Sequence, residues 1–210
     1  MTTHIPRARK QLENEKNFLR WGGLTGIFAF IVWIVEMPLY GYVDPFIPEG
    51  LMRFPDVRVA LGVSTLLCMT TAFLSISLVL VLYRIFSGTS NALAFLGCVS
   101  GVIGYISTAL GDVSTFLAFA PISDLYHASV VTPEVQATVV ILWETTIGLV
   151  NTFFFVGSLF MMIGFIVLGV VMLRAPSFGR RFGGVSIFLG VIGIMGWLPV
   201  YLSRDQLGCK

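Results

Sequence analysis

Three acidic residues lie within or at the end of long apolar segments, where acids are rare. Glu36 occurs in "WIVEMPLY", Asp112 in "ALGDVSTF" and Glu144 in "VVILWETTIGLVN". An ionised carboxylate in the hydrocarbon core of a bilayer costs at least ~2.5 kcal/mol, so such side chains usually face a helix-bundle interior or a watery cavity. The chemistry open to them there is the binding of a proton, a small cation or a polar ligand.

Polar residues accompany these acids at helical spacing. Tyr105 and Thr108 precede Asp112 by seven and four residues, and Asn151 follows Glu144 by seven. Because such steps keep side chains on one face of a helix, each acid is expected to belong to a polar stripe. Three stripes at one depth predict a single pocket that opens to the outer side. The predicted ligand-binding residues are Glu36, Tyr105, Thr108, Asp112, Glu144 and Asn151.

Each acid also has a structural interpretation, which the sequence leaves open. Acids near a membrane surface reach the headgroups or cap helices, and Asp112 before "VSTF" fits the N-cap of a short outer helix. Glu36 is close to Pro38, where its helix is expected to end. Glu144 is solvated if its helix projects from the membrane. The pocket and the set of unrelated surface acids are therefore competing hypotheses.

A second candidate site combines Asp124 and His127 in "SDLYH". On a helix this spacing puts both side chains on one face, and an imidazole with carboxylates is a ligand set for a divalent metal. With Asp112 and Glu144 the same residues offer an acid and a base for a metal-dependent membrane hydrolase. A single histidine is much weaker evidence than an HExxH motif, and no GxSxG nucleophile motif is present.

Several other chemistries are excluded by residue type and position. The only lysines are Lys10, Lys16 and Lys210, so no apolar segment offers a Schiff-base lysine for retinal. The two histidines, His4 and His127, are expected on opposite sides of the membrane and cannot hold a haem between them. No nucleotide-binding loop or metal-type cysteine spacing occurs, and the basic residues form no nucleic-acid-binding face. The cofactor is otherwise unknown.

Composition predicts an all-α, polytopic membrane helix bundle. Of the 210 residues, 56% are hydrophobic and 11% charged, and the mean hydropathy is +0.90. A bilayer core of about 30 Å needs roughly 20 apolar residues in a helix. Five segments meet this length, at about 19–40, 59–85, 92–111, 136–173 and 183–202. A helix through the whole fourth segment is more than about 50 Å long, so it must tilt, bend at Gly148 or project from the membrane.

Basic residues predict the orientation. With the N-terminus in the cytoplasm, nine of the thirteen Lys and Arg residues fall on the cytoplasmic side, and the connection 112–135 has none. We therefore expect a cytoplasmic tail at 1–18, a transmembrane domain at 19–203 and an outer tail at 204–210. No signal-peptide cleavage site follows the polar N-terminal segment, so the first span is expected to be retained.

Glycine spacing predicts close helix packing. Gly22 and Gly26 form one GxxxG motif and Gly97 and Gly101 another, and a run of glycines at three-residue spacing begins at Gly190. Such faces bring helices together within a chain, in a homo-oligomer or against another membrane protein. The lipid bilayer itself is the other expected partner.

The layout resembles small bacterial multi-pass families that carry only a domain-of-unknown-function label. The features concerned are the basic N-terminal tail, the acid near the end of the first span, the outer loop, and "RAPSFGRRFGG" before a glycine-rich last span. The resemblance implies an inner-membrane protein of a bacterium or archaeon and transfers no functional residue. The leading hypothesis is a non-catalytic protein that binds a small ligand, cation or lipid, as a carrier or accessory subunit. The alternatives are the metal-dependent hydrolase and an interaction subunit without a pocket.

Overall fold

The computed structural model describes residues 5–41, 50–128, 132–175 and 180–207. Side chains of the first and last helices are described over 19–39 and 180–196. Every element in these ranges is an α-helix, which confirms the predicted all-α class. The five helices are α1 (Ile5–Gly41), α2 (Gly50–Phe86), α3 (Asn91–Tyr126), α4 (Pro133–Arg174) and α5 (Arg180–Leu207).

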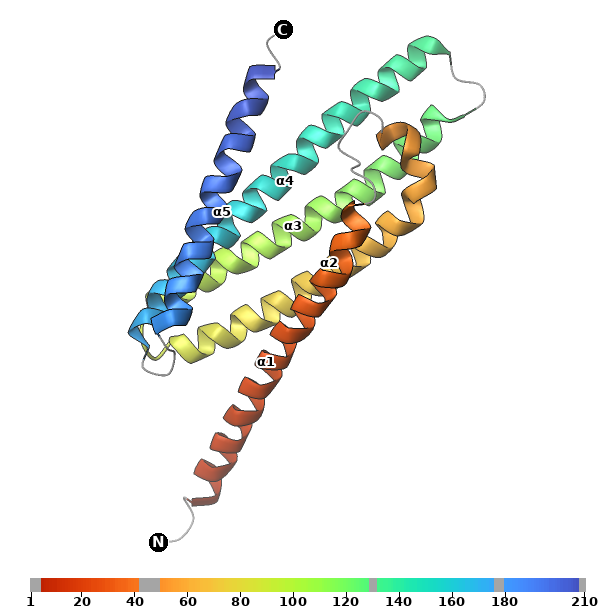
Figure 1. Ribbon diagram of the computed structural model, residues 1–210. Helices are drawn as coiled ribbons and strands as arrows, with labels where there is room; N and C mark the ends of the chain where they lie inside the picture. Colours follow the sequence, from red (N-terminus) through yellow and green to blue (C-terminus); the bar gives the residue numbers. More distant parts are fainter. Residues whose placement is uncertain (1–4, 42–49, 129–131, 176–179, 208–210) are drawn as a thin grey trace.

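The bundle is built by packing each helix on its neighbours in the chain. α2, α3 and α4 run side by side, with α3 in the middle, and α2 also touches α4 at a few residues (Figure 1). α1 packs on α2 and continues toward the N-terminus beyond it. α5 packs on α4 and then diverges from it toward the C-terminus. The middle of α3 is therefore enclosed between α2 and α4.

Four helical segments are long and apolar enough to cross a membrane: Leu19–Leu39 in α1, and the whole of α2, α3 and α4. Their outer surfaces carry large exposed apolar side chains such as Phe28, Leu66, Phe73 and Leu110. An apolar surface of this kind suits lipid rather than water. The described residues of α5 do not add a fifth segment of this kind. The chain is accordingly a membrane-embedded helical bundle.

Three of the helices are longer than the segments predicted from the sequence and longer than a bilayer core requires. α2, α3 and α4 contain 37, 36 and 42 residues, or about 54–63 Å at 1.5 Å per residue, against about 30 Å for a hydrocarbon core. α2 begins at Gly50 and not at Val59, and α3 continues to Tyr126. The expected connection 112–135 is mostly helix, and Asp112 lies inside α3. The N-cap interpretation of Asp112 is therefore wrong, and the helix continues beyond the predicted span at 92–111.

The extensions of α2, α3 and α4 are held by a core of their own. Phe54 of α2, Phe119 of α3 and Trp143 of α4 are almost fully buried. The Phe119 and Trp143 rings stack with centroids 4.1 Å apart, and Phe54 meets Trp143 edge-on at 5.9 Å. Aromatic pairs at these distances stabilise a core beyond the area they bury. This local packing explains why the helices continue where the sequence turns more polar.

Pro55 lies inside α2, where proline removes one backbone hydrogen bond. The missing N–H leaves the carbonyl of Leu51 without its usual partner four residues later. Leu51 is buried, and the Ser123 hydroxyl of α3 donates to its carbonyl oxygen at 3.3 Å. A side chain from the next helix therefore satisfies the group that the proline freed. The sequence carries the proline, but only the packing supplies the donor.

Glycines allow α3 and α4 to approach closely. A Cβ added to Gly104 would lie 2.8 Å from the carbonyl oxygen of Gly157, and one added to Gly164 would lie 3.0 Å from the backbone nitrogen of Gly101. Those backbone atoms cannot move aside as a flexible side chain does. No described atom lies within 4 Å of a Cβ added to Gly148, where a bend was expected, and α4 is one continuous helix there. Small residues thus set the distance between α3 and α4.

The other predicted glycine faces are also used within the chain. Gly22 and Gly26 face Val81 and Leu78 of α2, and Gly190 faces Ile166 of α4. Contacts with a partner through these glycines would therefore compete with contacts inside the molecule. An oligomer through the glycine faces remains a prediction.

We predict that Gly104→Ala destabilises the bundle whereas Gly148→Ala does not. The added methyl group at Gly104 meets backbone atoms of α4, and overpacking of this kind costs about 1–3 kcal/mol. At Gly148 the methyl group meets open space, and alanine is the better helix former. Thermal unfolding of both variants in the same detergent compares them. Equal midpoints would contradict the close approach of α3 and α4.

Candidate functional site

The candidate site begins with two buried acids. Glu36 of α1 and Asp112 of α3 are only 7% and 3% exposed, although both lie in apolar segments. Both belong to the predicted pocket. Their burial removes the interpretation in which each carboxylate reaches separately for the headgroups. The acids must therefore be accommodated inside the bundle.

The antiparallel register of α1 and α2 fixes the depth of Glu36. Gly26 of α1 faces Leu78 of α2, as Gly22 faces Val81. Because the helices are antiparallel, Glu36, ten residues after Gly26, lies level with Cys68, ten residues before Leu78. Cys68 in turn donates its thiol hydrogen to Oδ2 of Asp112, with sulfur and oxygen 2.6 Å apart. Three successive helices thus contribute one side chain each to the same level.

These three side chains are close enough to affect one another electrostatically. The Glu36 carboxyl group interacts with Asp112, and Cys68 interacts with both acids. We refer to Glu36, Cys68 and Asp112 as the carboxylate–thiol cluster. Two negative charges close together in a medium of low dielectric constant repel each other, and each has also lost its hydration. Occupation by a proton or another small cation relieves both penalties.

A polar face of α2 continues on either side of Cys68. It consists of Ser64, Cys68, Thr71 and Ser75, at steps of four, three and four residues. Ser64 is 1% exposed, and within the described part of the chain neither its Oγ atom nor Oγ1 of Thr71 has a hydrogen-bond partner. Ser75 is hydrogen-bonded to the side chain of Tyr105 on α3. None of these α2 residues was among the predicted site residues, although their spacing is visible in the sequence.

The predicted stripe on α3 divides between two neighbours. Tyr105 faces α2 through Ser75, on the same side as Asp112. Thr108 faces α4 instead: its hydroxyl donates to the Gly104 carbonyl oxygen at 3.0 Å and lies where a Cβ of Gly157 would be. Steps of three and four residues drift around a helix, so a central helix presents the two ends of one stripe to different partners. Thr108 therefore lies on the α4 side of the stripe, where its hydroxyl is occupied by the Gly104 carbonyl and by the contact with Gly157.

The two predicted residues on α4 have different environments. Asn151 is half-buried, and the packing of Gly111 against Phe154 places it near the depth of Asp112. Glu144 is exposed, while its neighbour Trp143 points into the core. Adjacent residues on a helix are about 100° apart, so the inward position of Trp143 turns Glu144 away. Glu144 therefore points away from the core, contrary to the prediction that it lines one outward-opening pocket with Glu36 and Asp112.

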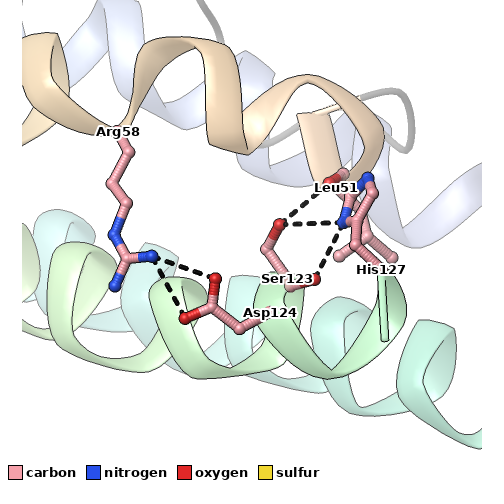
Figure 2. Close-up of polar contacts among 5 residues, drawn as sticks. All are labelled: Leu51, Arg58, Ser123, Asp124 and His127. Carbon is pink, nitrogen blue, oxygen red and sulfur yellow. Dashed lines mark hydrogen bonds and ion pairs between the residues drawn. The ribbon is translucent and has the colours of Figure 1, made fainter. Parts of the chain in front are cut away.

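Asp124 and His127 lie on the extension of α3 and have other contacts (Figure 2). Asp124 forms an ion pair with Arg58 of α2, with nitrogen and oxygen 2.9 Å apart and both side chains about half-exposed. Nδ1 of His127 lies 2.8 Å from the carbonyl oxygen of Ser123. Across the described ranges, no three His, Cys, Asp or Glu side chains are arranged to hold a metal ion. The structure thus does not bring Asp124 and His127 into the predicted metal site.

We predict that Ser123→Ala destabilises the protein more than Asp124→Ala. The serine substitution leaves the buried Leu51 carbonyl without its donor, at a cost of about 1–3 kcal/mol. An exposed ion pair such as Arg58–Asp124 contributes less than about 1 kcal/mol. Thermal midpoints of the two variants provide the measurement. A larger loss for Asp124→Ala would mean that the ion pair, and not the carbonyl freed by Pro55, holds this end together.

Comparison with known proteins adds no family to these observations. No family model and no curated protein matches the sequence, and no solved structure matches the fold.

Proposed function

We propose that this chain is a non-catalytic integral membrane protein that binds a small cation at Glu36 and Asp112. The observation that carries the proposal is the burial of two interacting carboxyl groups, from different helices, within segments apolar enough to span a bilayer. Ionisable residues retained at such positions are usually functional because their burial is costly. A carrier or an accessory subunit that responds to the bound cation fits this arrangement.

The depth of the cluster supports access from the outer side. Asp112 follows the start of α3 by 21 residues, and Cys68 precedes the end of α2 by 18. These separations correspond to about 32 and 27 Å of helix. If the Phe86–Asn91 end lies at the cytoplasmic face, the cluster reaches the opposite boundary of a core about 30 Å thick. A cation then reaches the acids without crossing the full hydrocarbon layer.

The metal-dependent hydrolase is the less favoured function. Its proposed residues are separated: Asp112 contacts Cys68, Asp124 pairs with Arg58, and Glu144 is exposed. An acid and a base act together only when both reach the same reacting group. The interaction subunit without a pocket becomes the better interpretation if the two buried acids bind nothing.

The topology proposed with this function has five spans, a cytoplasmic N-terminus and an outer C-terminus in the cell inner membrane. The asymmetry of Lys and Arg supports it. Cys209, which lies outside the described residues, provides the test. In a variant with Cys68 and Cys98 replaced by serine, we expect Cys209 to react with an impermeant maleimide added to intact cells. Reaction only after permeabilisation would place the C-terminus inside.

We predict that Glu36→Gln and Asp112→Asn remove a cation-dependent change in stability that Glu144→Gln retains. A ligand that binds only the folded protein raises the thermal midpoint, by about 2–4 °C for each kcal/mol of binding in a chain of this size. Because proton binding counts as cation binding here, raising the pH without another cation should lower the wild-type midpoint. The measurement is thermal unfolding in detergent across pH and across Na⁺, K⁺, Mg²⁺ and Ca²⁺ concentration.

Glu144→Gln is the matched control, since it removes an exposed acid from the same bundle. The proposal requires the wild type and Glu144→Gln to behave alike and the two buried-acid variants to lose the dependence. A wild-type midpoint that responds neither to pH nor to any of the four metal cations would refute cation binding and favour the interaction subunit.

A further inference from the structure

Two buried hydroxyl groups beside the candidate site have no hydrogen-bond partner among the described residues. They are Oγ of Ser64 and Oγ1 of Thr71, both on α2. Leaving such a group unsatisfied is costly, and buried polar groups in proteins are nearly always paired with protein atoms or with water. Their position next to the carboxylate–thiol cluster therefore calls for a bound partner.

Helix geometry places these hydroxyls on both sides of the cluster. Ser64 precedes Cys68 by four residues and shares the face of α2 that meets Asp112. Thr71 precedes Ser75, which faces α3, by four residues and Leu78, which faces α1, by seven. Thr71 thus lies on α2 between the residues that face α3 and those that face α1. The two hydroxyls are one helical turn outward and one turn inward from Cys68.

The distance between the hydroxyls excludes a single ion as their shared partner. Ser64 and Thr71 are seven residues apart, which is about 10.5 Å along α2. A metal cation of the hard type needs six or more oxygen ligands, or an octahedral shell, around one point. Here the oxygen atoms are spread over two turns, with the thiol of Cys68 between them. A row of water molecules, each bonded to two to four polar groups, can partner oxygen atoms that are spread along a helix in this way.

We propose that the polar face of α2 holds a file of bound water through the carboxylate–thiol cluster, and that the cation bound by Glu36 and Asp112 is a proton delivered along it. This inference rests on the proposed function and specifies its ligand. A hydronium ion in the outer water gives up one proton, which bonds to a carboxylate oxygen of the pair and leaves a water molecule. Release reverses the step, and no other bond forms or breaks.

The groups that face the bound proton come from three helices. They are Glu36 from α1, Cys68 from α2, and Asp112 with Tyr105 farther inward from α3. On α4 the described acid nearest in sequence to this level is Glu144, which is exposed. Along α2 the basic residues on either side, Arg58 and Arg84, are ten and sixteen residues from Cys68. Among these described residues, the two acids and the thiol are the titratable groups at the level of the bound proton.

Infrared difference spectroscopy of the full chain in lipid nanodiscs tests the inference. We expect the C=O band of a protonated carboxyl group, which disappears as the pH is raised and is absent from Glu36→Gln and Asp112→Asn. In D₂O the wild-type band should shift quickly because water reaches the site. The double variant Ser64→Ala with Thr71→Val should slow this exchange about tenfold, which corresponds to ~1.4 kcal/mol for lost water anchors.

Two control variants separate loss of the water file from loss of the fold. Thr71→Ser keeps a hydroxyl and should exchange like the wild type. Thr70→Val alters the neighbouring exposed threonine, whose hydroxyl bonds to the Leu66 carbonyl oxygen, and should also leave the exchange unchanged. If Thr71→Ser slows exchange as much as the double variant, a structural disturbance explains the effect and the water file is rejected.

Other results overturn the inference in distinguishable ways. Slow exchange in the wild type, or a higher thermal midpoint for the double variant, would show that the hydroxyls are dry. A carboxyl band that a metal cation abolishes at constant pH would keep the proposed cation site but reject the proton. Absence of both the band and any cation-dependent stability would reject the inference and the proposed function together.

Discussion

The close contact of α3 with α4 determines how the rest of this bundle is arranged. Gly104 and Gly157 allow the two backbones to meet where a single methyl group would not fit. Because lipid provides no hydrophobic force that pulls helices together, such contacts between small residues supply the association through close packing. With one face of α3 held against α4, the adjoining face of the helix is presented to α2. Asp112 lies on that second face and therefore points into the bundle.

The position of Asp112 then controls the chemistry of the interior. Its carboxylate accepts a hydrogen bond from the thiol of Cys68 on α2 and interacts with Glu36 on α1. One buried acid alone would not distinguish a binding site from a single buried polar group that the fold tolerates. Beside the two acids, the hydroxyls of Ser64 and Thr71 on the polar face of α2 have no hydrogen-bond partner among the described residues. The proposed proton and water file would satisfy both the charge and the hydrogen bonding.

The long extensions of α2, α3 and α4 have a different physical basis. Their stability comes from the aromatic core of Phe54, Phe119 and Trp143 and from the serine that satisfies the carbonyl freed by Pro55. Arg58 and Asp124 add an exposed ion pair across the same two helices. This end carries conspicuous polar residues, yet their contacts are structural. The proposed cation site lies deeper, where the sequence offers fewer charged groups but each costs more to bury.

Much of the architecture is determined by the sequence itself. Apolar segments of sufficient length predict helices, and the high cost of a carboxylate in hydrocarbon marks Glu36 and Asp112 as candidates by their position in the chain. Glycine spacing indicates close packing, although it does not say which helix is the neighbour. Helix ends are predicted less well, because an apolar segment reports the thickness of the bilayer and not the length of a helix that continues beyond it.

Only the tertiary structure decided which polar residues meet. Thr108 and Glu144 carry the same periodic signal as Asp112, but one packs on α4 and the other turns outward because Trp143 occupies the inward position. Conversely, Cys68 joins the site through the registers of α1 with α2 and of α2 with α3. Periodicity places a residue on a face of its own helix. It contains no information about which neighbour covers that face, because that is fixed by packing between helices far apart in the chain.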